Sequence, residues 1–473
     1  MMLDILEEKD KNLLLVAKML EQYNNELLTE TIIEENLSLT KYKIERSLEE
    51  LNDLLQEKYI FVNRRGEVSY HAIGMDDLEK LKNLLVRRSK KFKLLHYILL
   101  GGVNIKKFAD KEFLSLPQVY RKKFELKVFL NQEFDIDCEG LKLSGKSELC
   151  IRNALFDIYF FYFSGFEIHF SNEAEQYAAW LEQLILTDLN IRLSKTQKEK
   201  LNLFSLIHYS RVHTGNSMVK EDLEQIKLVL NVEIKEFELL NKHMKVYNFN
   251  YEECFILDIY IVINIYLNGE LLYLGESITN LISSFRLIFY NNVIKRELFS
   301  KKITNDLKLV FSNWFLFSSQ ATSFIDEFQI NYFCEMYPIF HSISFTFVDE
   351  YCRCLLGTTV KNTQLAKYYY DIIFLLIKNV STKEVEPSIK VCVDFSQGES
   401  YNFFIERNIK CYKDLNIELQ RYNDINTDLY LTDNYQPRLR AKQIIWRDPP
   451  TKNDWMYFAD TVLEMKRDKI ETE

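Results

Sequence analysis

The residues whose types and spacing could do chemistry are cations gathered in one part of the chain. Between Lys58 and Lys127 the sequence holds 17 Lys and Arg against 7 Asp and Glu, while the whole chain of 473 residues has a formal net charge of −9. From residue 151 onward there are 35 basic against 43 acidic residues. Lys and Arg bind phosphate oxygens, and a basic segment in an acidic protein is a typical electrostatic signature of a nucleic-acid site. The segment is therefore either a nucleic-acid site or a solvated helix face, and the arrangement of its elements, described below, favours binding to double-stranded DNA.

Catalytic and metal chemistry have no candidate residues in a recognisable pattern. The HExxH, GxSxG, GxGxxG and phosphate-loop patterns are absent from the sequence. Cys352 and Cys354 are the only close pair among eight cysteines, and no second pair completes a metal site. We therefore expect no enzyme activity, no metal and no cofactor, and we expect the cysteines to be reduced and mostly buried.

The histidines are dispersed along the chain. They stand at His71, His96, His169, His208, His213, His243 and His341. His208 and His213 lie five residues apart in SLIHYSRVHTGN, which does not place both on one helix face. We expect most histidines to be ordinary core or surface residues, with a ligand or phosphoacceptor role for His208 or His213 as the alternative.

The elements up to residue 73 predict a first winged helix-turn-helix unit that positions cations on DNA. Helices are expected at residues 11–22 and 29–35, and Ser38 or Thr40 can cap a third. In that third helix apolar residues recur at helical spacing, at Ile44, Leu48, Leu51 and Leu55. Its opposite face carries Tyr42, Lys43, Arg46 and Glu49.

The segment YIFVNRRGEVSYH follows this helix and predicts a β-hairpin with Arg64 and Arg65 at its tip. Such a hairpin would be the wing of the unit. We expect phosphate contacts from Lys41, Arg64 and Arg65, and a base contact from Arg46 at the front of the recognition helix.

The same series of elements is predicted again in a second winged helix-turn-helix unit at residues 74–150. A long helix at 75–99 carries cations expected to contact phosphate, namely Arg87, Arg88, Lys90, Lys91 and Lys93. A short helix follows at 105–113, and Ser115 caps a third helix with Gln118 at the capping-box position. The candidate DNA-binding residues of this third helix are Gln118, Tyr120, Arg121 and Lys122. Cys138-Glu139-Gly140 is expected to form the turn of the second wing.

The rest of the chain is predicted to be mainly helical, because the whole sequence has only 12 Gly and 6 Pro to interrupt helices. Residues 151–276 and 277–384 are expected to be two helical regulation domains, and residues 385–473 a small α/β domain. In the last domain β-rich runs are expected at 389–393, 416–419, 428–431 and 443–446, with helices at 402–408 and 455–465.

The acidic start MMLDILEEKDK and the polar residues within the longest charge-free run, 309–325, predict neither a signal peptide nor a membrane span. We therefore expect a cytoplasmic protein.

Three segments carry a resemblance to a known family. They are LKLSGKSELCIRNALFDIY at 141–159, SRVHTGN at 210–216 and IKVCVDFSQGES at 389–400. With two winged units, two helical domains and a C-terminal α/β domain, the chain resembles the Mga-type virulence regulators of Gram-positive bacteria. The resemblance implies a DNA-binding transcription activator that forms a dimer. It also implies helical domains similar to the regulation domains (PRD) controlled by the sugar phosphotransferase system, and a last domain similar to enzyme IIB (EIIB-like).

The sequence departs from this family where regulation would be chemical. Glu199 stands where relatives carry a phosphorylatable histidine, and a carboxylate there could act as a permanent negative charge. Phe395 occupies the phosphocysteine position of enzyme IIB, and Cys392 is expected inside a strand. These departures argue against control by phosphorylation and favour an interaction role for the last domain, and phosphotransferase-system proteins are kept as alternative partners. The alternatives to a DNA-binding regulator are a helical interaction scaffold that does not bind DNA, and a phosphotransferase-system component.

Overall fold

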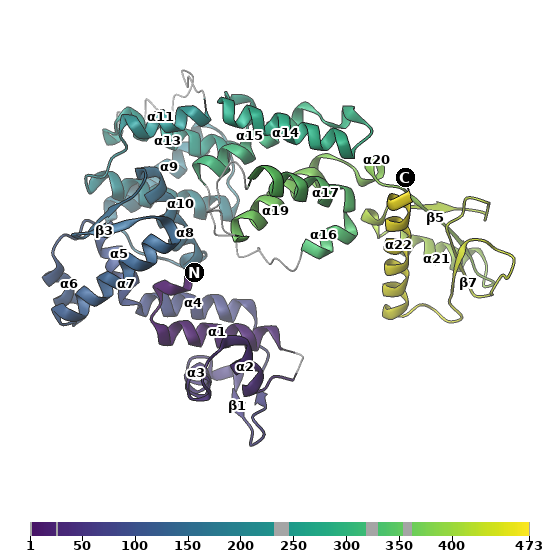
Figure 1. Cartoon of the computed structure of the whole chain (residues 1–473), viewed down its shortest axis with the longest axis horizontal. Coiled ribbons are helices and arrows are strands. Elements are labelled where there is room, and N and C mark those ends of the chain that lie inside the picture. The colour runs from purple at the N-terminus through teal and green to yellow at the C-terminus, as the bar shows by residue number, and fades with distance from the viewer. Residues whose placement is uncertain (1, 25–26, 231–245, 318–329, 353–361, 473) are drawn as a thin grey trace. The chain divides into compact units, whose positions relative to one another are not determined.

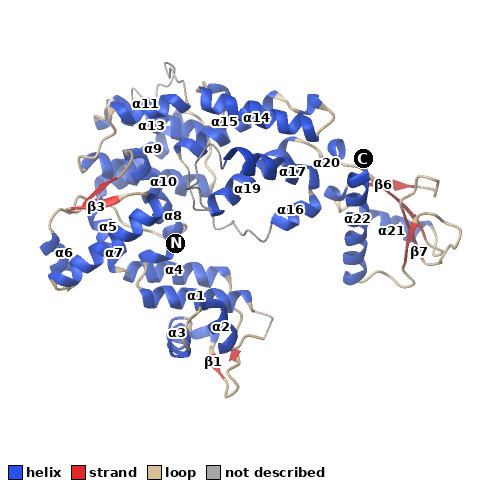
Figure 2. Ribbon diagram, viewed as in Figure 1, coloured by secondary structure: helices blue, strands red, loops and turns tan. Residues whose placement is uncertain are grey.

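A computed structural model describes residues 2–24, 27–230, 246–317, 330–352 and 362–472. The protein is mainly helical, as expected, and Figure 2 shows its strands in two small hairpins and one C-terminal sheet. His243 and Cys354, named above, lie outside the described residues. Within the described part of the chain, no helix is both long and apolar enough to cross a membrane.

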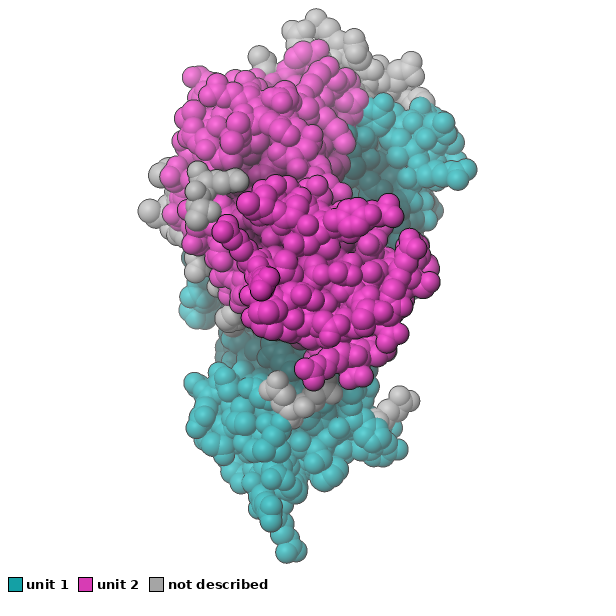
Figure 3. Space-filling model, turned by 90° about the vertical axis from the view of Figure 1, so that its right-hand side faces the viewer, with its two compact units in different colours: residues 1–227, 233–267, 316–323 teal, residues 228–232, 268–315, 324–473 magenta. Residues whose placement is uncertain are grey.

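The chain forms two compact units. Unit 1 comprises residues 1–227, 233–267 and 316–323, and unit 2 comprises residues 228–232, 268–315 and 324–473 (Figure 3). The helices and hairpin strands up to residue 147, all in unit 1, are α1 (Glu8–Gln22), α2 (Glu30–Leu37), α3 (Lys41–Leu54), β1 (Phe61–Val62), β2 (Val68–Ser69), α4 (Met75–Arg88), α5 (Lys90–Leu99), α6 (Ile105–Glu112), α7 (Leu116–Phe134), β3 (Asp137–Glu139) and β4 (Lys142–Ser144).

The first winged unit has the predicted elements. α3 packs against α1 and α2, and its apolar residues Ile44, Leu48 and Leu51 are buried. Thr40 is the residue that precedes this helix, whereas Ser38 ends α2 in the left-handed conformation. The antiparallel pair β1 and β2 forms the wing.

The single long helix expected at 75–99 is wrong, because the chain breaks at Ser89 into α4 and α5. The buried Ser89 hydroxyl accepts a hydrogen bond from the Phe92 backbone N–H at 3.2 Å, which starts α5, and donates to the Ile5 carbonyl at 2.6 Å. Ser89 is thus an N-cap that also ties the helix junction to the N-terminal segment. α5, α6, α7 and the β3–β4 hairpin then form the second winged helix-turn-helix unit, which lies within unit 1 (Figure 1).

The turn of the second hairpin lies one residue later than expected. Cys138 and Glu139 pair within the strands, and Gly140 and Leu141 form the two-residue turn with φ of 54° and 66°. Two successive positive φ angles are typical of a type I′ turn, whose twist matches that of a β-hairpin.

The remaining helices before the C-terminal domain begin with α8, whose N-cap Ser147 accepts from the Cys150 backbone N–H. They are α8 (Glu148–Phe163), α9 (Asn172–Asp188), α10 (Lys195–His213), α11 (Lys220–Val229), α13 (Tyr251–Ile261), α14 (Glu276–Asn292), α15 (Lys301–Leu316), α16 (Ile330–Met336), α17 (Pro338–Phe347), α19 (Asn362–Asn379) and α20 (Thr382–Val385).

The C-terminal part of unit 2 contains a parallel four-stranded sheet in the order β6-β5-β7-β8. The expected strands are present as β5 (Ile389–Asp394), β6 (Ile417–Gln420), β7 (Leu429–Thr432) and β8 (Lys442–Ile445), and the helices are α21 (Glu399–Ile409) and α22 (Lys452–Thr472). Both helices bury side chains against the same alternating strand residues, including Val391 and Leu431, so both cover one face of the sheet. α22 is the yellow helix of Figure 1.

The large apolar side chains between Trp446 and Phe458 are divided between the core and the surface of this domain. Trp446 and Phe458 lie in the core of this domain, whereas Met456 and Tyr457 are more than half exposed. Loops instead of helices connect β6 to β7 and β7 to β8. Those loops expose large apolar side chains, at Tyr422, Ile425 and Tyr435.

Candidate nucleic-acid interface

The first half of α3 presents the predicted polar face. Tyr42, Lys43 and Arg46 are exposed, and the side chain of Tyr42 is 69% accessible. Glu45 is also exposed in this half but lies beside Lys41, and Glu49 lies on the polar face about one turn beyond Arg46. The geometry therefore allows only the N-terminal half of α3 to approach a phosphate backbone closely.

Lys41 is exposed but already has carboxylate partners. Its ammonium lies 3.1 Å from Glu30 and 3.8 Å from Glu45. The hydrogen bond with Glu30 raises the pKa of Lys41, so this lysine stays charged while part of its field is neutralised by Glu30. Lys41 consequently offers less attraction to phosphate than the sequence predicts.

The first wing presents Arg64 and Arg65 on a turn that is held by hydrogen bonds of Asn63. The Asn63 side-chain oxygen accepts from the backbone N–H groups of Arg65 at 2.8 Å and Glu67 at 3.1 Å, and its amide donates to Glu67 Oε2 at 2.6 Å. Gly66 takes a φ of 76°, which favours glycine. Both arginines are exposed, and this hairpin forms the narrow projection at the lower end of unit 1 in Figures 1 and 3.

The wing is also attached at its base to the segment before α2. The Glu30 backbone N–H donates to the Gly66 carbonyl at 2.9 Å, and the Val68 N–H donates to the Leu28 carbonyl at 2.9 Å. These bonds hold the backbone of the hairpin at the start of α2, and α2 in turn packs against α3.

The second recognition helix, α7, begins at the predicted capping box. The Gln118 side-chain oxygen accepts from the Ser115 backbone N–H at 2.8 Å and from the Ser115 hydroxyl at 2.9 Å. Val119, Leu126 and Leu130 are buried as expected. The capping role occupies the Gln118 oxygen, which is therefore not available to accept a hydrogen bond from a base while the cap is formed.

The outward face of α7 mixes one cation with aromatic side chains. Arg121 is exposed, with its Nε 3.6 Å from Glu125. Tyr120 is 56% and Phe124 is 66% accessible. This face can contact phosphate through Arg121 and the thymine methyl group through its aromatic side chains.

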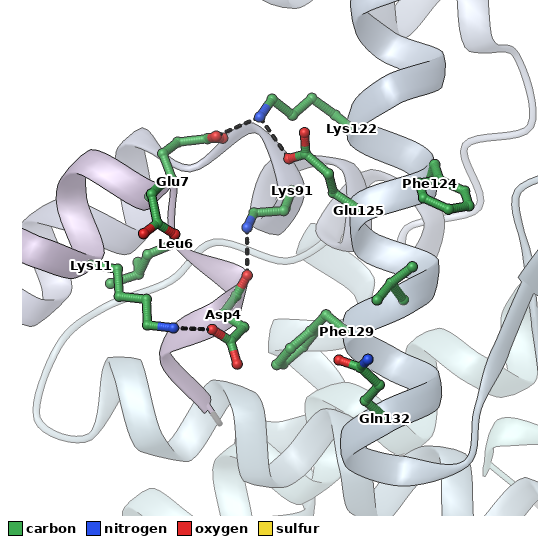
Figure 4. A pocket seen from close by; sticks show the side chains of 12 residues that line it. Asp4, Leu6, Glu7, Lys11, Lys91, Lys122, Phe124, Glu125, Phe129 and Gln132 are labelled. Atoms are coloured by element: carbon green, nitrogen blue, oxygen red, sulfur yellow. Dashed lines mark hydrogen bonds and ion pairs between the residues drawn. The ribbon is translucent and has the colours of Figure 1, made fainter. Parts of the chain in front are cut away.

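The prediction that Lys122 faces DNA is wrong, because its side chain extends toward the N-terminal segment. Its ammonium lies 2.6 Å from Glu7 and 2.7 Å from Glu125, and the side chain is 14% exposed (Figure 4). Burial alone would lower the pKa of Lys122, but the two carboxylates raise it overall. Lys122 thus joins α7 to the start of the chain instead of facing solvent.

The cations of α4 and α5 are likewise engaged within the protein, which corrects their expected phosphate role. Lys90 and Lys93 lie 2.8 and 2.9 Å from Glu112, and Arg88 lies 3.0 Å from Glu50. The buried Lys91 donates to the Asp4 carbonyl (Figure 4), and its burial lowers its pKa. The fifth cation, Arg87, donates to the Asn83 side chain and the Glu167 carbonyl and lies over the Phe163 ring.

Two further cations were missed by the sequence analysis. Lys106 and Lys107 are exposed in the first turn of α6, where the Asn104 side chain caps the helix by accepting from both of their backbone N–H groups. The helix before a recognition helix crosses the DNA backbone in this class of motif. The sequence signal for this site is the N-cap residue Asn104, followed two and three residues later by Lys106 and Lys107.

The residues considered for regulation do not form one site. Glu199 is partly exposed on α10, with Lys195 at 4.0 Å. His208 is fully buried, and its Nδ1 lies 3.1 Å from Arg152. His213 is exposed and stacks on Tyr209 with ring centroids 3.7 Å apart.

His208 belongs to a buried ionic network that joins α8, α10 and α13. Arg152 forms two hydrogen bonds to Glu253, at 2.6 and 2.9 Å, and one to Glu148 at 2.9 Å. Arg211 adds two bonds to Glu148, at 2.8 and 2.7 Å. The pairing of two arginines with two carboxylates explains how four charged side chains are buried together.

Metal and thiol chemistry gain no support from the structure. The described residues contain no group of three or more His, Cys, Asp or Glu side chains that could hold a metal ion. Six cysteines in the described part of the chain are free. Three are buried, namely Cys138, Cys254 and Cys392, and three are exposed, namely Cys150, Cys334 and Cys411. The expectation of mostly buried thiols is therefore wrong for half of them.

The loop after β5 holds a carboxylate of its own chain. Phe395 is buried in the domain core, and Cys392 lies inside β5 as expected. The Ser396 backbone N–H donates to Asp433 Oδ1 at 3.0 Å, and its hydroxyl donates to Asp433 Oδ2. The Ser396 backbone N–H and hydroxyl, in the loop after β5, are therefore already hydrogen-bonded to Asp433 in the loop after β7.

The comparisons with known proteins bear on the second winged unit alone. A search of curated proteins found no match. A family model described as the Mga helix-turn-helix domain matches residues 76–163, which include α5, α6, α7, the β3–β4 hairpin and α8. Residues 76–163 are thus similar to the Mga helix-turn-helix domain, and this similarity indicates a DNA-binding transcription regulator.

Proposed function

We propose that the protein is a transcription activator that binds double-stranded DNA through both winged units. The observation that carries this proposal is the division of the cations in the basic segment. Lys43, Arg46, Arg64, Arg65 and Arg121 are exposed at recognition-helix and wing positions. Most cations of α4 and α5, by contrast, are held by carboxylates and carbonyl groups of the protein.

The exposed cations have different roles in this proposal. Arg64 and Arg65 contact phosphates beside the groove that α3 enters, and Arg46 contacts a base edge. Arg121 contacts DNA from α7, and Lys106 and Lys107 add phosphate contacts from α6. Phosphate contacts give affinity that falls with salt, while base contacts give sequence preference.

Binding is tested with the full-length protein and a library of random DNA duplexes. Retained duplexes are sequenced after repeated selection, and the best one is labelled for fluorescence polarisation between 50 and 200 mM KCl. We expect an enriched sequence or shape and an affinity that falls steeply with salt. Failure to retain DNA at the lowest salt would contradict the proposal.

Activation is tested by transcription in vitro from a promoter containing the selected duplex. We expect more transcript with the protein than without it. Less transcript would make the protein a repressor and leave its DNA binding unaffected.

We further propose that the C-terminal domain joins subunits and performs no chemistry. Phe395 supplies no nucleophile at the phosphocysteine position, and the loops around the sheet expose Tyr422, Ile425 and Tyr435. Aromatic side chains are enriched at interfaces. Deleting residues 387–473 should shift sedimentation toward the monomer; an unchanged dimer would place the interface elsewhere.

A further inference from the structure

A cavity of about 760 Å³ lies beside the last helix of the matched helix-turn-helix domain. It is bounded by the end of α8 and the segment at 164–169, by α9 and by α10. Its volume lies in the range of small-molecule sites, which are about 300 to 1,000 Å³. Neither the expected DNA contacts nor the proposed subunit interface uses this cavity.

The inner wall of the cavity is apolar. Phe163, Leu203 and Leu206 line it and are less than 9% exposed, and Phe160 lines it from α8. The Lys200 ammonium lies 5.2 Å from the Phe160 ring centroid, so this ring already attracts a cation on one side. The wall therefore suits a ligand with an apolar body.

The charged residues of the cavity are mainly carboxylates. Four line it, at Glu167, Glu175, Glu182 and Glu199, against two lysines at Lys195 and Lys198.

Two of the carboxylates, Glu182 and Glu199, are less exposed than the lysines that lie beside them. The side chains of Glu182 and Glu199 are 24% and 30% exposed, whereas those of their partners Lys198 and Lys195 are 57% and 89% exposed. An acidic ligand would meet this negative charge at short range. A ligand with one cationic group and an apolar body would be complementary to both the carboxylates and the wall.

The segment at 164–169 connects the cavity to the helix-turn-helix domain. Phe163 lines the cavity and also lies under the Arg87 guanidinium of α4, at 5.0 Å from its ring centroid. Arg87 donates to the Glu167 carbonyl, and His96 of α5 lies 3.1 Å from the His169 carbonyl. A ligand that moves this segment therefore changes contacts made by α4 and α5.

We propose that this cavity is an effector site for a small amphipathic amine, and that its occupancy changes DNA affinity through the segment at 164–169. The binding half of the proposal stands without DNA; the coupling half rests on the proposed function. Glu199, at the position where relatives carry a phosphorylatable histidine, then contributes its charge to ligand recognition.

Binding is tested by isothermal titration of the full-length protein with phenethylamine. Phenethyl alcohol and phenylacetate are the matched neutral and anionic probes. For a ligand of this size we expect a Kd on the order of 1 mM or tighter, and at least about tenfold weaker binding of both comparison probes. No saturable binding of phenethylamine, or equal binding of all three probes, would overturn the site.

Two pairs of variants localise the binding. Ala179→Phe fills the cavity from the exposed side of α9 and should weaken phenethylamine binding at least about tenfold, whereas Gln176→Phe on the same helix lies outside the lining and should not. Glu199→Gln should weaken binding several-fold, with Glu173→Gln as the control. Equal loss in a variant and its control, with unchanged melting temperatures, would place the binding elsewhere.

Coupling is tested by fluorescence polarisation of a labelled duplex with and without saturating phenethylamine. Thermodynamic linkage requires the duplex to change amine affinity by the same factor as the amine changes duplex affinity. We expect such a reciprocal change, and we expect Ala179→Phe to abolish it. Unchanged duplex affinity at saturation would overturn the coupling; absence of any duplex binding would overturn the proposed function while leaving the amine titration intact.

Discussion

Removal of the two arginines at the first wing tip gives the sharpest test of the DNA interface. The turn is held by Asn63 and by the φ of Gly66, and neither arginine side chain takes part in those bonds. Arg64→Ala and Arg65→Ala together should therefore change the free energy of unfolding little, by less than about 0.5 kcal/mol per exposed site. The variant loses charge without losing the wing.

The expected magnitude follows from counterion release. Each phosphate contact contributes roughly 0.9 to the slope of log affinity against log salt, so loss of two contacts lowers the slope by about 1.8. Over a fourfold change in salt, from 50 to 200 mM KCl, this difference corresponds to about a 12-fold smaller loss of affinity in the variant than in the wild type.

Fluorescence polarisation of one labelled duplex across the salt series measures both slopes. Arg438→Ala with Arg440→Ala is the charge-matched control, because these two arginines are also exposed but lie in the loop between β7 and β8. Its slope should equal that of the wild type. An unchanged slope in the wing variant, or the same reduction in both variants, would refute phosphate binding by the wing.

Three further predictions concern the recognition helix, the internal cations and acid stability. Arg46→Ala should cost about 1 to 3 kcal/mol of binding to the selected duplex if Arg46 contacts a base, measured by polarisation; unchanged affinity would remove α3 from base recognition. Lys90→Ala with Lys93→Ala should leave the slope of log affinity against log salt unchanged. The double variant should lower the free energy of unfolding, measured in urea, by about 1 to 3 kcal/mol, because Glu112 loses both lysine partners. A reduced salt slope would show that these lysines contact DNA. Burial lowers the pKa of His96 to about 4 from an ordinary value of 6.5. Between pH 6.5 and pH 4, His96 is therefore protonated in the unfolded chain but neutral in the folded chain. Stability should therefore fall as pH falls from 6.5 to 4. His96→Gln should reduce the loss between pH 7 and 4.5 by about 2 to 3 kcal/mol in urea titrations, and an equal loss in both proteins would contradict the assignment.

Local patterns in the sequence were sufficient to predict the recognition elements. The apolar spacing from Ile44 to Leu51, the Asn63–Gly66 turn and the Ser115–Gln118 cap each depend on residues close in the chain, and all are present in the structure. The β-rich runs of the last domain were predicted for the same reason. Their order in the sheet was not, because strand order depends on contacts between distant segments.

Two of the errors share one physical cause, which is pairing with residues far away in the sequence. Lys122 is a candidate DNA contact by its position on the third helix of the second winged unit, but its partner Glu7 is more than a hundred residues earlier. The break at Ser89 likewise depends on the Ile5 carbonyl as well as on the local cap. Helical periodicity continues through this junction, so the sequence pattern alone predicts one helix.

The N-terminal segment is attached to both winged helix-turn-helix units, and this attachment limits the DNA sites that the protein can bind. Ile5 holds the α4–α5 junction, and Glu7 holds α7, while α1 packs against α3 and α4 within the same compact unit. The two recognition helices are thus joined by packed side chains and not by a free linker. One added base pair moves a DNA subsite by about 3.4 Å and rotates it by about 35° around the axis. Operators for this protein should therefore tolerate base changes far better than single-base insertions between the two contacted segments.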